Sequence, residues 1–304
     1  MSLLDTPLRG LLGIELPLVQ APMANNAPPA LAAAVSAAGA LGSIAGAALS
    51  PEELRLAIRE VREATDRPFA VNLFAPPYLR DGVLEVVLEE RPPVFSFTFG
   101  IVDPAPLRAV GIVTIGTATT ADEARALEET GVDAVVAQGA EAGGHRGSFL
   151  GGFPLVPLVE LVPACVEAVL LPVVAAGGIA DGRDIVELLN LGASGVSLGT
   201  AFLFTPEAGR PRRHLEALRT VETVVTDAYT GRPMRAAGTP VLRELMAGPP
   251  PLPFPEQRAV AAQKGPLFMG GTGARRAREL DAGELVRLLF AEAQEAGASS
   301  MPPG

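Results

Sequence analysis

The chain is poor in the residues that build disulfides and metal centres. It has one cysteine, Cys165, and two histidines, His145 and His214, among 304 residues. A single cysteine excludes an internal disulfide and any cysteine-rich metal site. Two histidines would leave a zinc ion dependent on an unusual, carboxylate-rich ligand set. We therefore expect no metal site, and we expect Cys165, in an apolar helix-like stretch, to pack in the core.

Positive charge is also scarce. Lysine and arginine together number 24 against 34 acidic residues, which gives a formal net charge of −10. Without a basic stripe to neutralise phosphates, neither nucleic acid nor an anionic membrane surface is an expected partner. No apolar signal-peptide core follows the first ten residues, where Asp5 precedes the only base, Arg9. We expect a cytoplasmic protein.

One uncharged stretch, Leu31 to Leu49, has the length of a membrane span. Its content is mostly alanine, glycine and serine, and Gly39 and Gly42 interrupt it. We interpret it as a helix, a turn and a buried strand rather than as a span.

Eight short apolar runs alternate with helix-like segments along the first two thirds of the chain. Continuous apolar runs are typical of strands buried on both faces, as in a parallel sheet. Capping-box patterns predict helix starts at Ser50–Glu53, Thr120–Glu123 and Asp281–Glu284. The predicted strands are Leu18–Gln20, Ala40–Ile44, Phe69–Leu73, Val94–Phe97, Ile112–Ile115, Ala134–Ala137, Val173–Ala175 and Gly195–Leu198.

This alternation favours an α/β fold of the (β/α)₈ TIM-barrel type over a doubly wound open sheet. Pro22 follows the first strand where a dinucleotide-binding sheet would carry its glycine fingerprint, and the glycine-rich signals come after the last three strands. We predict a barrel core over residues 1–204. Residues 205–304, with proline-rich and glycine-dense segments, are predicted to form helices and loops that pack on the barrel.

Two glycine turns at the ends of the last two strands predict an anion site. Gly177 and Gly178 lie between the seventh strand and a helix, and Ser197-Leu198-Gly199-Thr200 closes the eighth. Backbone N–H groups at such turns bind phosphate, and two turns on adjacent strands can hold one phosphate together. The alternative is a pair of tight turns that bind nothing.

Other strand ends carry residues suited to a flat aromatic cofactor. Backbone near Ala21 and Met23 could approach its face, and the amides of Asn72 and Gln138 could pair with ring carbonyls and nitrogens. The alternatives are that Met23 belongs to the core and that Asn72 serves a local turn.

The loop Gln138–Gly147 after the sixth strand is glycine-rich and contains His145. A histidine at such a site can exchange a proton near neutral pH. Glu141 could orient His145 or pair with a surface arginine, and Arg146 could be a solvated or structural charge. We expect His214, in a polar stretch, to be exposed and uninvolved.

Together these motifs resemble the nitronate monooxygenases, formerly called 2-nitropropane dioxygenases. The resemblance rests on Gln20–Met23, Asn72–Phe74, Ser96–Gly100, the Gln138–Gly147 loop, Ala175–Gly182 and Gly199-Thr200, and it extends through Thr226–Pro233 and Gly265–Leu267. The chain departs from the family pattern at Asn25-Asn26, where glycines are common, and at Met269–Gly271, which lacks an aromatic residue.

The resemblance implies a TIM barrel with non-covalent FMN. By that likeness the flavin is surrounded by Met23, Asn72, Gln138 and Gly143, its phosphate is held by Gly177, Gly178, Gly199 and Thr200, and His145 is the active-site histidine. The implied reaction is the oxidation of an alkyl nitronate by O₂ to a carbonyl compound and nitrite. His145 would hold the substrate anion or, with a neutral nitroalkane, act as the base.

Three alternative functions stay open. One is an FMN- and NAD(P)H-dependent reductase of the enoyl-acyl-carrier type, which shares the barrel and a similar loop. The second is a flavin-binding protein without turnover, and the third is a barrel that binds a sugar phosphate and uses no flavin. The expected partners are a small nitronate or nitroalkane and O₂. The sequence does not determine the oligomeric state, and a homodimer is one assembly that it allows.

Overall fold

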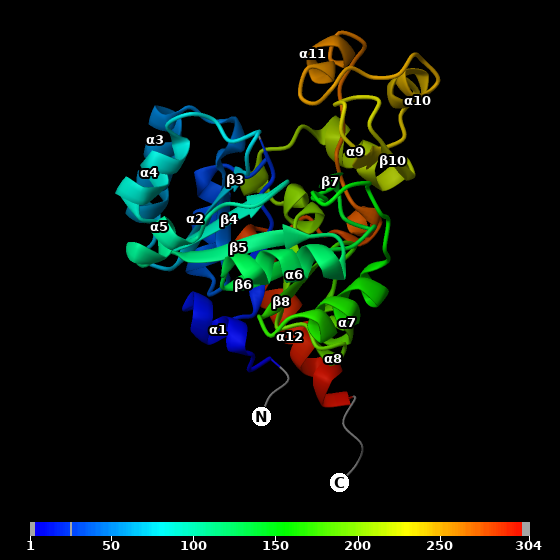
Figure 1. Cartoon of the computed structure of the whole chain (residues 1–304). Helices are drawn as coiled ribbons and strands as arrows, with labels where there is room; N and C mark the ends of the chain where they lie inside the picture. Colours follow the sequence, from blue (N-terminus) through cyan, green and yellow to red (C-terminus); the bar gives the residue numbers. More distant parts are fainter. Residues whose placement is uncertain (1–3, 25, 300–304) are drawn as a thin grey trace.

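Eight parallel strands surround a common axis in the computed structural model, which describes residues 4–24 and 26–299 (Figure 1). Asn25, part of the departure from the family pattern, lies outside the described residues. All eight predicted strands are confirmed, with ends that shift by up to three residues. The strands, in their order around the sheet, are β1 (Leu18–Gln20), β9 (Gly195–Leu198), β8 (Val173–Ala176), β6 (Ala134–Gln138), β5 (Val113–Ala118), β4 (Val94–Thr98), β3 (Phe69–Phe74) and β2 (Gly42–Ala45).

The two edges of this sheet meet next to β1. Val19 forms an isolated parallel bridge with Leu41, just before β2. Leu41 N–H donates to Leu18 O at 2.9 Å, and Gln20 N–H donates to Leu41 O at 2.8 Å. The sheet is therefore a nearly closed barrel, as predicted.

A ring of helices covers the barrel, one after each strand. The last member, α12, comes from the far end of the chain and packs against α8 and α2. The helices are α2 (Pro29–Ala37), α3 (Pro51–Ala64), α4 (Val83–Glu90), α5 (Ala105–Ala109), α6 (Ala121–Thr130), α7 (Leu158–Ala168), α8 (Gly182–Asn190) and α12 (Ala282–Ser299). The uncharged stretch forms α2 and β2, and none of the described helices is long and apolar enough to cross a membrane.

The three predicted helix starts are confirmed at α3, α6 and α12, whereas the capping boxes are confirmed only in part. Ser50 and Glu53 form the capping box of α3. Thr120 accepts from Glu123 N–H at the start of α6, but the Glu123 carboxylate does not return to Thr120. It accepts instead from Thr119, at 2.7 Å from the amide nitrogen. The predicted hydrogen bond from Thr120 N–H to the Glu123 carboxylate is therefore wrong, because other donors occupy that carboxylate.

Apolar side chains fill the lower half of the barrel. Val19, Ala70, Ile115 and Val174 point inward from four strands, and the short helix α1 (Pro7–Leu12) packs its leucines against them. A Cβ on Gly195 would lie 2.4 Å from the Leu8 side chain, so only glycine permits this packing. The filled lower half leaves the carboxyl ends of the strands as the open end of the barrel.

An insertion between β9 and α12 lies above that open end (Figure 1). Its β10 and β11 form an antiparallel sheet with β7 (Gly144–His145), a pairing that the prediction of helices and loops missed. The division of the chain at residue 204 stays a prediction. The insertion contains α9 (Arg212–Thr220), β10 (Thr223–Thr226), β11 (Met234–Ala237), α10 (Pro240–Met246) and α11 (Gln257–Ala261), and the 3₁₀ helices of the chain are η1 (Gly46–Ala48), η2 (Thr200–Phe204), η3 (Pro206–Ala208) and η4 (Thr272–Arg276).

Candidate active site at the open end of the barrel

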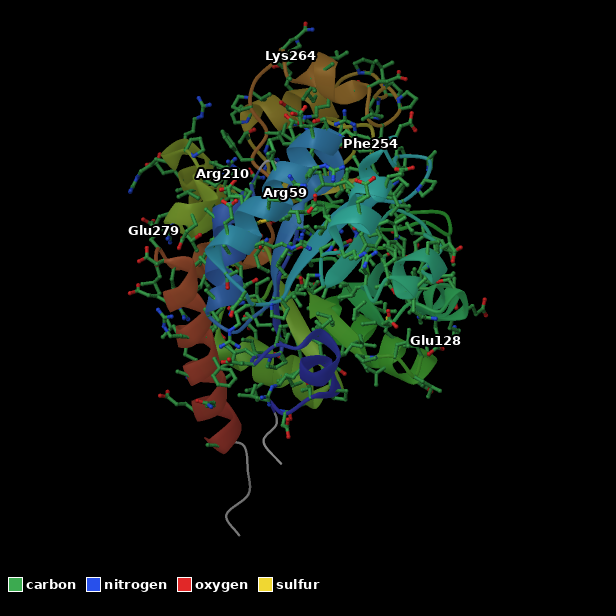
Figure 2. The ribbon with its side chains drawn as sticks, turned by 90° about the vertical axis from the view of Figure 1, so that its left-hand side faces the viewer. Arg59, Glu128, Arg210, Phe254, Lys264 and Glu279 are labelled. Atoms are coloured by element: carbon green, nitrogen blue, oxygen red, sulfur yellow. The ribbon has the colours of Figure 1, made fainter. Side chains whose placement is uncertain are left out.

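A cavity of about 860 Å³ lies between the carboxyl ends of the strands and the insertion. Its lining includes three arginines, Arg80, Arg210 and Arg258, and no aspartate or glutamate among the described residues. Figure 2 shows Arg210 and Phe254, which both line the cavity, in the upper part of the molecule. In a chain with a net charge of −10, this lining forms a locally positive site that attracts anions.

All twelve predicted site residues line this one cavity. They are Ala21, Met23, Asn72, Gln138, Gly143, His145, Gly177, Gly178, Ser197, Leu198, Gly199 and Thr200. They come from five strand ends and meet because parallel strands end at the same edge of a barrel. Their roles toward a ligand stay predictions.

The upper layer of the barrel interior is polar, in contrast to the layer below. Asn72 donates from Nδ2 to Ser96 Oγ at 3.0 Å. Ser43, which is 1% exposed and also lines the cavity, has a hydroxyl without a hydrogen-bond partner among the described residues. A buried polar atom without a partner is costly, so Ser43 Oγ is available for a ligand.

The two glycine turns expose backbone donors to the cavity. Gly177 and Gly178 have φ angles of +135° and +73°, which favour glycine. Within the described part of the chain we find no acceptor for the N–H groups of Gly178, Gly199 and Thr200. The Thr200 hydroxyl is engaged differently, because it accepts from Gly271 N–H at 2.8 Å.

Residues of the insertion press directly on the His145 loop. A Cβ on Gly143 would lie 2.5 Å from the carbonyl carbon of Gly270, and one on Gly271 would lie 2.6 Å from Glu141 O. Thr272 N–H donates to Glu141 O at 3.1 Å. Both glycines are therefore required where the two backbones touch.

His145 lies in β7, paired with Met234 of β11. Its Nε2 is 3.1 Å from Thr230 Oγ1, and its ring centroid lies 5.2 Å from that of Phe254. Burial, together with the positive charges of Arg232 and Arg258, lowers the pKa of His145 to about 3. The imidazole is therefore neutral at neutral pH.

These features match a known family. A family model described as nitronate monooxygenase matches two overlapping stretches of the chain, residues 5–80 and 79–292. The chain belongs to the nitronate monooxygenase family. A nitronate monooxygenase from Pseudomonas aeruginosa is 41% identical, with 93% of this chain and 97% of the relative covered. A probable nitronate monooxygenase from Staphylococcus saprophyticus is 39% identical over 76% of this chain and 78% of its own length.

Solved structures agree with this assignment. The nitroalkane oxidase of Streptomyces ansochromogenes superposes with a TM-score of 0.90 at 37% identity, covering 97% of this chain and 99% of its own. FabK from Thermotoga maritima superposes with a TM-score of 0.84 at 33% identity, with 97% and 98% covered.

In this nitronate monooxygenase family member, buried charges hold the His145 loop. Arg146 is fully buried and donates to the carbonyl oxygens of Gln138 and Gly139. Burial, with the nearby charge of Arg235, lowers its pKa to about 10. Gln138 also pins the loop, because its Oε1 accepts from Gly147 N–H at 2.8 Å and its Nε2 donates to His145 O at 3.0 Å. Of the two predictions for Arg146, a solvated charge or a structural charge, the structure supports the second.

Neither predicted role of Glu141 is correct. Its carboxylate accepts from Leu158 N–H at 3.0 Å, at the start of α7, and contacts neither His145 nor a surface arginine. A second carboxylate, that of Glu123, is 1% exposed and accepts from Phe149 N–H. The two carboxylates thus accept from backbone amides of the segment that follows the loop, while Arg146 donates to carbonyl oxygens of the loop itself.

The prediction that His214 is exposed is wrong. His214 is 6% exposed and lines the cavity. Its Nε2 lies 3.1 Å from Met269 O, and because a carbonyl only accepts, Nε2 is the donor. The polar neighbours of His214 occupy the outer face of α9, and His214 occupies the inner face.

Sequence reasoning also missed three residues around His145, of which Thr230 and Phe254 line the cavity. Thr230 and Arg232 were noted only as part of the family resemblance, and Phe254 only as part of the proline-rich segment. Phe254 lies 5.1 Å from the ring of Tyr78, and Arg232 lies over the ring of Phe99 at 3.9 Å. A single aromatic residue inside a proline-rich segment was the one available signal for Phe254.

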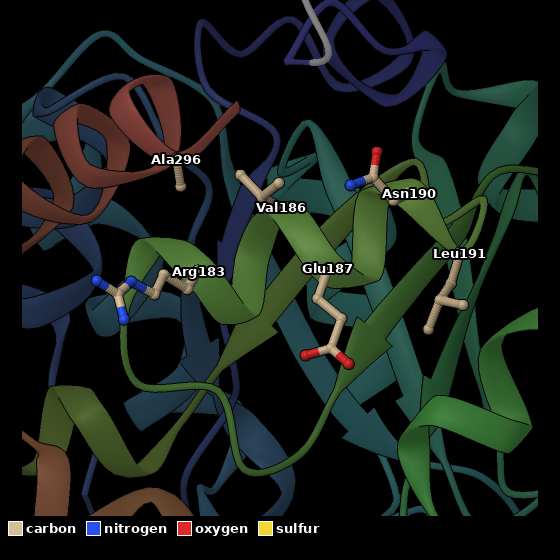
Figure 3. A pocket seen from close by; sticks show the side chains of 6 residues that line it. All are labelled: Arg183, Val186, Glu187, Asn190, Leu191 and Ala296. Carbon is tan, nitrogen blue, oxygen red and sulfur yellow. The ribbon is translucent and has the colours of Figure 1, made fainter. Parts of the chain in front are cut away.

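A second, smaller hollow of about 390 Å³ lies on the outside of the barrel between α8 and α12 (Figure 3). Its side chains include Arg183, Glu187 and Asn190 of α8 and Ala296 of α12. It contains none of the predicted site residues.

Proposed function

We propose that this protein oxidises alkyl nitronates with O₂ to a carbonyl compound and nitrite, with FMN as its cofactor. The observation that carries the proposal is the convergence of the twelve predicted residues on one positively lined cavity with a neutral histidine. The relatives named nitronate monooxygenase and the structural neighbour named nitroalkane oxidase support the same chemistry.

The cavity has the donors and the space that FMN requires. Free backbone N–H groups at Gly178, Gly199 and Thr200 suit a phosphate. The unpartnered hydroxyl of Ser43 and the amide of Asn72 suit polar atoms of the ring system. Bound FMN supplies redox chemistry, because a flavin takes electrons from an organic anion and passes them to O₂.

His145 acts as a neutral group in this proposal. With a pKa near 3, its ring carries no positive charge at neutral pH and cannot attract a nitronate as a cation. Arg80, Arg210 and Arg258 supply the attraction instead. Toward a neutral nitroalkane, the lone pair of the ring can accept the α-carbon proton, a transfer that the three arginines assist by stabilising the nitronate anion that forms. Of the two roles left open by the sequence, proton acceptor is therefore the one we propose.

Anaerobic mixing with propyl-2-nitronate tests this function. We expect the visible absorption of the bound flavin to change on mixing, and nitrite to appear once O₂ is admitted. His145→Ala should lower turnover of neutral nitroethane by about 100-fold or more, the usual contribution of a general base. A flavin spectrum that does not respond to the nitronate would refute the proposal.

The same experiment addresses the competing reductase function, which the similarity to FabK favours. NADH should leave the flavin spectrum unchanged over the time in which the nitronate reacts. Rapid bleaching by NADH, without nitrite release from the nitronate, would establish the reductase instead. The homodimer stays a prediction, which light scattering on the purified protein can check.

A further inference from the structure

The turn Thr226–Pro233 places a threonine between His145 and a backbone carbonyl. Thr230 is 1% exposed. Its Oγ1 lies 3.1 Å from His145 Nε2 on one side and 2.8 Å from Arg232 O on the other. Nothing in the proposed reaction has yet used this residue.

The donors and acceptors of these two hydrogen bonds follow from which atoms carry a proton. A carbonyl oxygen only accepts, so the single hydroxyl proton of Thr230 is directed at Arg232 O. The Thr230 oxygen can then only accept from His145, so Nε2 must carry the ring proton. A neutral imidazole has one such proton, which leaves Nδ1 with a lone pair.

Nδ1 is open to the cavity. His145 lines the cavity, and no described residue hydrogen-bonds to Nδ1. Nδ1 is also not one of the sealed, unpartnered polar atoms of the described residues, so a ligand can reach it. Among the described residues, the charged groups that face the ring are Arg232 and Arg258, and no carboxylate lines the cavity to draw the ring proton to Nδ1.

The turn is held firmly in register with His145. Arg146 N–H donates to Pro233 O at 2.8 Å, and Arg232 Nε donates to Arg146 O at 3.1 Å. Gly231 has a φ of +80°, and a Cβ there would lie 2.2 Å from Leu252 O. The glycine thus lets the segment that contains Phe254 pass directly over the turn. Backbone contacts on both sides therefore fix the distance between Thr230 and the ring.

We propose that Thr230 is a positioning residue, which holds His145 with its proton on Nε2 so that Nδ1 is the atom that meets the substrate. The consequence for catalysis rests on the proposed function, whereas the position of the proton does not. The Thr230 hydroxyl accepts a hydrogen bond from the ring and donates one to the Arg232 carbonyl, so the direction of both hydrogen bonds is fixed.

Long-range ¹H–¹⁵N NMR on the ¹⁵N-histidine-labelled, flavin-loaded protein tests the tautomer directly. The chain has only two histidines, and His214, whose Nε2 donates to Met269 O, is an internal reference. We expect His145 at pH 7 to be protonated on Nε2 and not on Nδ1. A proton on Nδ1, or on both nitrogens, would overturn the proposal whatever the enzyme's activity.

Thr230→Val, which keeps the shape and removes the hydroxyl, tests the cause. We expect His145 to populate both tautomers and the His214 signals to stay in place. Thr230→Ser should restore the wild-type spectrum. Thr226→Val is the matched control, because Thr226 Oγ1 accepts from Ala228 N–H in the same turn. A Thr230→Val spectrum identical to wild type, or a Thr230→Ser spectrum unlike it, would contradict the assignment.

Activity separates this inference from the proposed function. Thr230→Val should lower kcat for neutral nitroethane by about tenfold or more, because a ring with its proton on Nδ1 has no lone pair there to accept the proton of the substrate. It should change kcat much less for pre-formed ethyl nitronate, which needs no proton removal. Equal losses with both substrates would indicate a merely structural role. If the wild type turns over neither substrate, the proposed function fails while the NMR result still decides the tautomer.

Discussion

Replacing His145 by glutamine should remove a defined part of this protein's sensitivity to acid. The folded protein holds the imidazole neutral, because burial and two nearby arginines lower its pKa from 6.5 to about 3. In the unfolded chain the same group takes up a proton near its ordinary pKa. Glutamine keeps an N–H group for Thr230 but does not titrate.

The sign and size of the effect follow from proton linkage. Between pH 6.5 and 3 the unfolded chain binds a proton that the folded protein does not, so the free energy of unfolding falls as the pH falls. Above pH 6.5 His145 is neutral in both states, so it does not lower the free energy of unfolding there. For the pKa values above, about 2 kcal/mol is lost by pH 5, and the limit below pH 3 is about 5 kcal/mol.

Urea unfolding at pH 8 and pH 5 measures this loss. The proposed cofactor, FMN, should be kept at one saturating concentration, because a ligand of the folded state adds its own stabilisation. The wild type should lose about 2 kcal/mol more than His145→Gln between the two pH values. His214→Gln, which keeps His145, should retain that part of the acid sensitivity, although burial lowers the pKa of His214 as well. Equal pH dependence in wild type and His145→Gln would refute the electrostatic argument.

Three further predictions test the packing around the site. Gly271→Ala should purify with little flavin, measured by visible absorption, because its Cβ would lie 2.6 Å from a backbone oxygen of the His145 loop; Gly10→Ala, where nothing lies within 4 Å, is the control and should keep its flavin. Arg146→Met should lower the free energy of unfolding in urea by about 3 kcal/mol, since it leaves buried carbonyls without donors; a change below about 0.5 kcal/mol would contradict the scaffold role. Cys165, buried and with a pKa raised by burial to about 11, should react with a thiol reagent only after unfolding, and rapid reaction of the native protein would refute its burial.

The barrel strands were predictable because each is a continuous apolar run, a pattern that burial on both faces requires. Strands β10 and β11 were not, because they are short and β10 is only half-buried, with the polar–apolar order Thr-Val-Val-Thr. Their partner β7 contains two residues, Gly144 and His145. No local pattern marks a strand of that length, and only pairing with a distant segment creates it.

The gathering of the twelve site residues was predictable for a similar reason. Residues at the carboxyl ends of parallel strands meet at one edge whatever their distance in sequence. The partners of charged side chains were not predictable. Glu141 caps α7 rather than orienting His145, and Glu123 binds loop amides rather than Thr120, because each carboxylate takes the nearest free donors in space.

The sequence by itself determined that the chain forms a barrel of parallel strands, that two glycine turns close its last strands, and that His145 lies in a loop at their carboxyl end. Local patterns of burial and backbone freedom are sufficient for those conclusions. The tertiary structure alone decided the chemical state of His145. Its proton is placed by Thr230, 85 residues further along the chain, and its neutrality follows from burial and from the charges of Arg232 and Arg258. Protonation depends on the distances between charges and donors in space, and only the folded chain defines those distances.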